Sequence, residues 1–187
     1  LCIEHNDVVG FDLAGPEVGF SVLNHKEACN LAHQNNINIT LHADWEVPEG
    51  IKEVALESKA KRIGHGSQLL NDISFKNNKL SFNTEAAKYV FDNKVPLEIC
   101  PTSNVQCGAY SDISEHSFGK LYELGFNVTI NTDNRLMSDI SMSEEINNVV
   151  ESFNLSEKDI RKITKNTIQA GFVKSELKNK LLEKISL

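Results

Sequence analysis

Five short apolar segments, each ending in polar residues, are the feature that most constrains how this chain can fold. They are VVGFDLAG (8–15), INITLHA (37–43), KRIGHG (61–66), VPLEICPTSN (95–104) and FNVTINTDN (126–134). Each is nearly continuous in apolar residues, which is typical of strands buried on both faces of a parallel sheet that helices cover. The segments therefore predict five buried, parallel strands.

Stretches with helical spacing separate and follow these segments. Residues 51–55 place apolar side chains on one helical face, and Gly125 stands where a helix C-terminal cap is expected. Later in the chain, SMSE (141–144) and SEKD (156–159) each predict the start of a helix. A final helix is predicted from the apolar spacing of Leu177, Leu181 and Ile185.

Regular alternation of strand and helix allows either a doubly wound sheet or a (β/α)8 barrel. A nucleotide-binding doubly wound sheet carries a glycine-rich turn after a strand, and neither GHG nor LAGPEVG has that spacing. We therefore expect an α/β fold of the TIM (β/α)8 barrel type, in a single domain over residues 1–187. Five strands cannot close such a barrel, so we expect it to be incomplete.

Composition excludes several kinds of partner. The formal net charge of −7 would repel a nucleic-acid backbone, and no apolar run approaches the roughly 20 residues that span a membrane. The first residues show no signal-peptide pattern, and the four cysteines form no C-x-x-C pair. We expect a cytoplasmic protein with reduced, mostly buried thiols and neither a nucleic-acid nor a membrane partner.

The polar residues at the segment ends are the candidate functional residues. In a barrel, the C-terminal ends of all strands meet at one mouth. The residues expected there are Gly15 with Glu17, His42, His65, Ser103 with Asn104, and Asp133 with Asn134. A single such residue is more typical of a strand end or turn, and Ser103 with Asn104 can serve as a simple cap. Two histidines and an aspartate on different strands, however, predict a Zn²⁺ site with one position left for water.

The same segment ends resemble a known family. DLAGPE, LHA, RIGHG, CPTSN and INTDNRLMS, in that order, resemble the C-terminal two-thirds of adenosine deaminases, particularly bacterial ones. The resemblance runs from about Val8 to the last helix, with the five segments matching the family's fourth to eighth barrel strands. It implies a (β/α)8 barrel with one catalytic Zn²⁺ that hydrolyses adenosine or deoxyadenosine, a purine nucleoside, releasing ammonia.

Residue roles follow from the resemblance, motif by motif. His42 and Asp133 would be zinc ligands, and His65 would orient the reacting water or take its proton. Gly15 would offer its backbone to the N3 edge of the purine. Asn134 would bind the substrate near N7, at a position where many members have aspartate.

Two departures from the family pattern affect the expected activity. None of the six histidines forms the H-x-H pair that supplies the other two zinc ligands. We expect a missing N-terminal barrel segment, either as part of a longer chain or, less simply, supplied by another chain. The two remaining ligands should bind zinc weakly.

The second departure concerns the family motif H-A-G-E, whose glutamate protonates purine N1. Without a gap, Trp45 occupies the glutamate position and cannot deliver a proton. With a one-residue gap, Asp44 takes that position, and Glu46 is the nearest glutamate otherwise. This departure keeps two alternatives open, a purine-binding protein without catalysis and a deaminase of another adenine-containing substrate.

Overall fold

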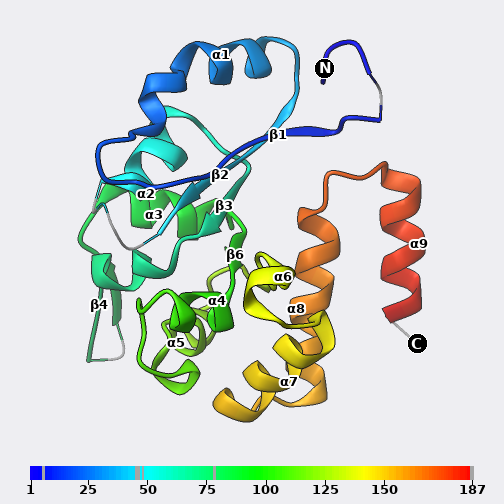
Figure 1. The fold of residues 1–187 in the computed structure, drawn as a ribbon. Helices are drawn as coiled ribbons and strands as arrows, with labels where there is room; N and C mark the ends of the chain where they lie inside the picture. Colours follow the sequence, from blue (N-terminus) through cyan, green and yellow to red (C-terminus); the bar gives the residue numbers. More distant parts are fainter. Residues whose placement is uncertain (6, 45–46, 48, 78, 186–187) are drawn as a thin grey trace.

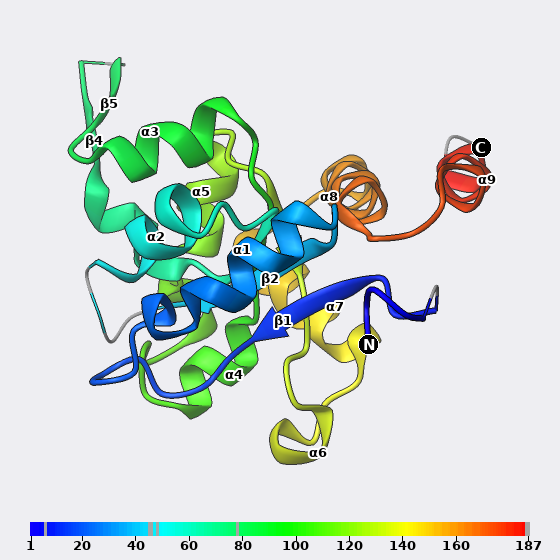
Figure 2. The same cartoon turned by 90° about the horizontal axis from the view of Figure 1, so that it is seen from above.

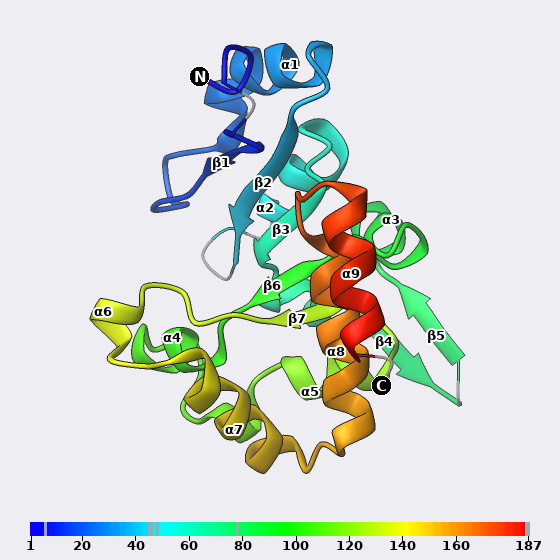
Figure 3. The ribbon, with the colours of Figure 1, turned by 90° about the vertical axis from the view of Figure 1, so that its right-hand side faces the viewer.

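Five parallel strands form one sheet in a computed structural model of the chain, which describes residues 1–5, 7–44, 47, 49–77 and 79–185 (Figure 1). The strands are β1 (Gly10–Leu13), β2 (Asn38–Ala43), β3 (Arg62–His65), β6 (Leu97–Ile99) and β7 (Val128–Ile130). Their order is β1-β2-β3-β6-β7, with every neighbouring pair parallel. The sheet curves from β1 at one edge to β7 at the other (Figure 3). This partial barrel confirms the expected α/β fold.

Helices follow the strands, and α1, α5 and α8 pack directly against the sheet. The helices are α1 (Lys26–Gln34), α2 (Gly50–Lys52), α3 (Glu85–Asp92), α4 (Pro101–Gln106), α5 (Phe118–Glu123), α6 (Arg135–Ser138), α7 (Met142–Phe153), α8 (Glu157–Ala170) and α9 (Ser175–Ile185). A π-helical turn, η2 (Glu53–Glu57), continues α2, and the short 3-10 helices are η1 (Val22–His25), η3 (Ser67–Asp72) and η4 (Ile113–Glu115). Among the described residues, we find no helix with both the length and the apolar character needed to cross a bilayer.

The two faces of the sheet carry different side chains, because successive residues of a strand point to opposite faces. Toward the helices, Ile39, Leu41, Ile63, Leu97 and Ile99 are fully buried.

The opposite face holds a polar row. Arg62 Nε lies 2.9 Å from Glu98 Oε1, and Thr40 Oγ1 donates to Glu98 Oε2 at 2.7 Å. Because the charges inside the curve of the sheet are paired with each other, the strands can be buried on both faces without leaving a charge unbalanced.

Two parts of the strand prediction were wrong. The segment 95–104 is not one strand: β6 ends at Ile99, and Pro101 occupies the first turn of α4, where its fixed φ and missing N–H suit a helix start. Ser103 and Asn104 therefore lie on a helix. The sequence analysis also missed the antiparallel hairpin of β4 (Ile73–Lys76) and β5 (Lys79–Phe82), which projects from the body (Figure 2).

The helix predictions were largely confirmed. Ser141 and Ser156 cap α7 and α8 through reciprocal capping boxes, and Gly125 follows α5 with a left-handed φ of 87°. The last helix, α9, stands beside α8 and away from the sheet (Figure 2), and Leu177 on its expected apolar face is 48% exposed.

The four cysteines are free, as expected. Cys29 and Cys100 are buried, but Cys107 is exposed and Cys2 only partly covered, so the prediction of mostly buried thiols was right for half of them.

Candidate metal and active site at the carboxyl edge of the sheet

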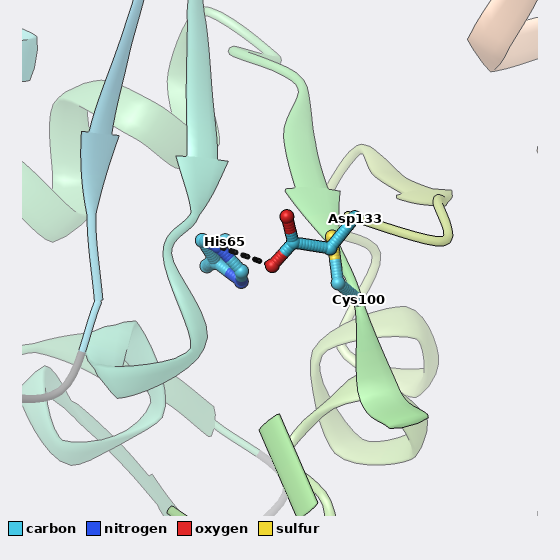
Figure 4. A group of neighbouring side chains, drawn as sticks. All are labelled: His65, Cys100 and Asp133. Carbon is cyan, nitrogen blue, oxygen red and sulfur yellow. Dashed lines mark ion pairs between the residues drawn. The ribbon is translucent and has the colours of Figure 1, made fainter. Parts of the chain in front are cut away.

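The carboxyl ends of the strands bring His42, His65 and Asp133 together. The rings of His42 and His65 lie edge to face with centroids 4.9 Å apart, and His65 Nε2 is 3.8 Å from Asp133 Oδ2. Cys100, directly after β6, points into the same space (Figure 4). Ligand atoms of His65, Cys100 and Asp133 all lie within 4.8 Å of one another. The structure therefore gathers potential metal donors from β2, β3, β6 and the segment after β7.

Backbone strain is present at two of these residues. His65 has a φ of 59° and Asp133 a φ of 56°, which is left-handed backbone that residues with a Cβ rarely adopt. Such conformations cost on the order of 1–3 kcal/mol each and cluster at active sites and ligand clamps. The strain aims both side chains at the shared space.

The two glycines of the GHG segment allow His65 to occupy this place. A Cβ on Gly64 would lie 3.2 Å from His42 Cα, so the glycine permits the close approach of β3 to β2. Gly66 has a φ of 72°, and a Cβ there would lie 2.8 Å from Leu97 Cδ2. A side chain at either position would displace the chain next to His65.

Glu17, from the loop after β1, holds His42 in place. Glu17 Oε1 lies 3.0 Å from His42 Nε2 and accepts from the Asp44 N–H at 2.7 Å, while Oε2 accepts from the Val47 N–H at 3.1 Å. Burial raises the pKa of Glu17, but these hydrogen bonds and the His42 charge outweigh it and lower the pKa below its usual value. Burial lowers the pKa of His42, yet the Glu17 contact and nearby carboxylates raise it overall.

Sequence reasoning placed Glu17 among the residues at the strand ends but assigned it no role. The only available signal was a carboxylate two residues beyond the glycine that ends the first apolar segment.

Asp44 is buried behind His65 and bonded on both carboxylate oxygens. Its Oδ1 accepts from the Ser67 N–H at 3.2 Å and hydroxyl at 2.5 Å, and its Oδ2 accepts from Asn104 Nδ2 at 2.6 Å. Asp44 Oδ2 also lies 3.6 Å from His65 Nδ1, and the residue is 3% exposed. Three hydrogen-bond donors therefore fix the position of this carboxylate.

The network continues from Asn104 to a second buried histidine that sequence reasoning missed. Asn104 Oδ1 lies 3.0 Å from His116 Nε2, and His116 Nδ1 accepts from the Phe118 N–H at 2.9 Å. The two contacts together require the proton on Nε2, which is the neutral ring. Burial and the nearby His65 charge lower the pKa of His116 to about 4.

The remaining candidate residues have defined places. Ser103 Oγ donates to Asp133 Oδ2 at 2.7 Å. Asn134 Oδ1 caps α6 by accepting from the Met137 N–H at 3.2 Å. Gly15 lies in a bend just after β1 and borders a hollow of about 470 Å³, which His42 also lines. Trp45 and Glu46 lie outside the described residues.

The donors at this edge suit a borderline cation such as Zn²⁺. The donors that lie within 4.8 Å of one another are an imidazole nitrogen of His65, a carboxylate oxygen of Asp133 and the thiol of Cys100, and the His42 ring adjoins them through its contact with His65. Zinc sites in proteins are built from these ligand types. His65 Nδ1 is buried and makes no hydrogen bond to any described residue, which is an unsatisfied polar atom beside the candidate site. Burial and nearby carboxylates, with Asp133 first among them, raise the pKa of Cys100 well above its usual value.

Comparisons with known proteins identify the family of the chain. The adenosine deaminase family model matches residues 1–187. The chain is 40% identical over 177 residues to an adenosine deaminase of Mycolicibacterium vanbaalenii, covering 92% of this chain and 49% of that protein. The chain therefore spans about half the length of the curated relatives it matches.

Solved structures show the same fold. An adenine deaminase from Arthrobacter aurescens superposes with a TM-score of 0.85 at 23% identity, over 95% of this chain and 51% of that one. An Arabidopsis N6-mAMP deaminase superposes with a TM-score of 0.78 at 28% identity, over 95% and 49%. Because the family model matches residues 1–187 and the curated relative is 40% identical over 92% of the chain, the chain belongs to the adenosine deaminase family.

Proposed function

We propose that this chain serves a zinc-dependent enzyme that hydrolyses adenosine or deoxyadenosine, releasing ammonia and leaving the inosine product. The observation that carries the proposal is the meeting of His42, His65 and Asp133 at the carboxyl edge of the sheet, within a chain of the adenosine deaminase family. Family membership suggests the chemistry, and the geometry supports assigning it to these residues.

His42 and Asp133 would hold the metal. When bound, zinc would activate water as a nucleophile and stabilise the charge that develops on the substrate. Glu17 fixes one ring nitrogen of His42 and leaves the other as the donor, an arrangement typical of metal-binding histidines. Ser103 holds Asp133 through a 2.7 Å hydrogen bond. Because catalytic zinc sites usually have three protein ligands, the proposal requires further ligands from a segment outside these 187 residues.

His65 would handle the proton of the attacking water. Its Nε2 faces Asp133, while its Nδ1 faces the buried Asp44 carboxylate at 3.6 Å. A carboxylate on one ring nitrogen controls the orientation and the protonated nitrogen of a histidine. General acid–base catalysis by a positioned side chain contributes about 10²–10⁴-fold in rate.

Asp44 would position His65 instead of protonating purine N1. Both of its carboxylate oxygens already accept hydrogen bonds from Ser67 and Asn104, so neither oxygen is free to donate a hydrogen bond to the substrate. Of the alternatives that the sequence offers for the proton donor, Glu46 is then the better candidate. Loss of the N1 donor should lower kcat in Glu46→Gln, and Asp44→Asn should lower it through His65; full kcat in Glu46→Gln would contradict the assignment of Glu46 as the donor.

Gly15 and Asn134 would contact the substrate. Gly15 borders the hollow of about 470 Å³ beside His42, which is large enough to admit a purine ring. We propose that its backbone meets the N3 edge and that Asn134, next to Asp133, meets N7. The Asn134 carbonyl oxygen caps α6, so its amide group would make the substrate contact.

A second candidate function is deamination of another adenine-containing substrate. The 28% identity to the Arabidopsis N6-mAMP deaminase favours this alternative over others. That protein has the same fold, and its name gives a substrate in which the adenine carries a methyl group and belongs to a nucleotide. In this proposal, Gly15 and Asn134 contact the base of the substrate. They do not by themselves select the sugar or phosphate.

The test is a substrate panel on the full-length protein, loaded with Zn²⁺ and followed by the ultraviolet absorbance change of deamination. We expect the highest kcat/KM for adenosine and deoxyadenosine, with kcat lowered by about 10²–10⁴-fold in His65→Asn. Higher kcat/KM for adenine or N6-methyl-AMP would support the second candidate. Calorimetric binding of adenosine without any turnover would instead identify a purine-binding protein that has lost catalysis.

A further inference from the structure

The amino ends of the same strands surround a hollow whose described lining contains lysines but no acidic residue. This hollow, here called the lysine cleft, has a volume of about 830 Å³. Its lysines are Lys59, Lys61, Lys94, Lys174 and Lys178. The cleft lies at the opposite edge of the sheet from His65 and Asp133, so it is separate from the candidate metal site.

Several elements contribute these lysines. Lys59 and Lys61 lie just before β3, and Lys94 lies shortly before β6. Lys174 comes from the link between α8 and α9, and Lys178 from α9 itself (Figure 3). The whole chain has 26 acidic and 19 basic residues, so a cleft with five lysines and no described carboxylate has the opposite charge to the chain overall.

None of the five lysines forms an ion pair with a described carboxylate. The three that donate side-chain hydrogen bonds to described residues use neutral acceptors. Lys61 Nζ donates to Asn38 Oδ1 at 2.8 Å, Lys94 Nζ to the Gly125 carbonyl at 3.0 Å, and Lys178 Nζ to the Gln169 carbonyl at 2.7 Å. The positive charge of the cleft is therefore not cancelled by these contacts.

Helix dipoles cancel only part of the positive charge of the lysine cleft. The carboxyl ends of η2, α3 and α8 are close to the cleft, and lysines are favoured at such ends. Each helix end carries roughly half a negative charge, which gives about −1.5 for three ends. Five lysine charges outweigh that sum. Helix capping therefore explains single lysines but leaves a net positive cleft.

Two of the lysines also occupy backbone positions that favour other residues. Lys59 and Lys94 each have a φ of 50°, in the left-handed region where glycine and asparagine are preferred. Backbone conformation therefore does not account for lysine at either position.

We propose that the lysine cleft binds a small anion with several linked phosphate groups. Five separated charges around about 830 Å³ exceed what a single phosphate can contact at once. A long polymer is disfavoured, because the net charge of −7 would repel the parts that extend beyond the cleft. The proposal does not depend on deaminase activity, since it concerns the opposite edge of the sheet and is read out by binding.

The experiment is calorimetric titration of the full-length protein with tripolyphosphate at low ionic strength. We expect saturable binding that weakens as NaCl is added, and weaker binding of inorganic phosphate. The test variant is Lys59→Asn with Lys94→Asn, because asparagine tolerates the left-handed backbone and the fold should be retained. If each lysine contributes as exposed ion pairs do, the double variant should bind about fivefold or more weakly.

The matched control is Lys158→Gln, at the exposed amino end of α8 and far along that helix from the cleft. It changes the net charge in the same direction and should leave tripolyphosphate affinity within about twofold. An unchanged or raised melting temperature in the K59N/K94N variant, together with weaker binding, would support the proposal. Absence of saturable tripolyphosphate binding, equal affinity for inorganic phosphate, or an equal loss in K158Q would overturn it.

Discussion

The two edges of the sheet differ in how their charged side chains are arranged. At the carboxyl edge, acidic and histidine side chains face each other: Glu17 is hydrogen-bonded to His42, and Asp44 Oδ2 lies 3.6 Å from His65 Nδ1. At the amino edge, the lysine cleft gathers like charges with only neutral described acceptors.

The difference between the edges shows what a parallel sheet can build from its two ends. Charges fixed by several partners give precise geometry, which catalysis needs. Like charges held together without partners give attraction for an opposite charge. At the carboxyl edge, a single substitution should strongly lower activity. At the amino edge, anion affinity should fall in small steps as each lysine is replaced.

The largest expected effect is on activity at the carboxyl edge. His65→Asn should lower kcat for adenosine by about 10²–10⁴-fold, because the group that moves the proton is lost. Lys59→Asn at the amino edge should leave kcat unchanged. Steady-state kinetics of the full-length protein measures both, and a His65→Asn variant with nearly full kcat would remove the distinction between the edges.

The next effect is a loss of stability in acid that comes from the buried network behind His65. His116 has a pKa of about 4 in the folded chain against an ordinary 6.5. The unfolded chain therefore binds this proton first, so stability is present above pH 6.5 and falls as the pH drops toward 4. This difference in pKa between the unfolded and folded chain corresponds to about 3 kcal/mol of folding free energy.

Urea unfolding between pH 7 and pH 4 measures how the free energy of unfolding changes with pH. His116→Gln should flatten this dependence, and His25→Gln at an exposed position should not. A slope that is the same in His116→Gln and in the unsubstituted protein would contradict the role of the buried ring.

A smaller effect is expected on metal affinity. Glu17→Gln should weaken zinc binding by about 10–100-fold, because a carboxylate on a metal-binding histidine orients the ring and raises its basicity. Glu49→Gln, an exposed substitution in the loop after β2, is the control. Competition with a chromogenic chelator gives the zinc dissociation constants of both variants. Equal zinc affinities for the two variants would argue against His42 as a ligand.

The smallest effect should come from stability at the amino edge. Lys61→Gln removes an exposed hydrogen bond to Asn38 and should change the free energy of unfolding by less than about 0.5 kcal/mol. Chemical denaturation measures it. A loss of several kcal/mol would mean that Lys61 has a structural role and that the two edges do not differ as described.

The strands and the meeting of their ends were predictable for a simple reason. A strand buried on both faces must be apolar along its whole length, and parallel strands point their carboxyl ends the same way. His42, His65 and Asp133 could therefore be expected together from their positions at segment ends. The start of α4 at Pro101 was missed because the polar residues after Ile99 were interpreted as the end of the strand.

The supporting residues could not be predicted from the sequence. Glu17 reaches His42 across a loop, and His116 reaches the site only through Asn104. Such contacts depend on how loops return to the sheet, which residue spacing does not encode. The left-handed backbone of His65 and Asp133 is likewise set by tertiary packing and not by local preference.

The most direct test of the central claim is adenosine turnover by the full-length protein before and after metal removal. A chelator should abolish the absorbance change and Zn²⁺ should restore it, whereas the same zinc concentration should not restore the activity of Asp133→Asn. Full turnover by the metal-free protein, or by Asp133→Asn without added zinc, would contradict the assignment of the carboxyl edge as a zinc-dependent deaminase site.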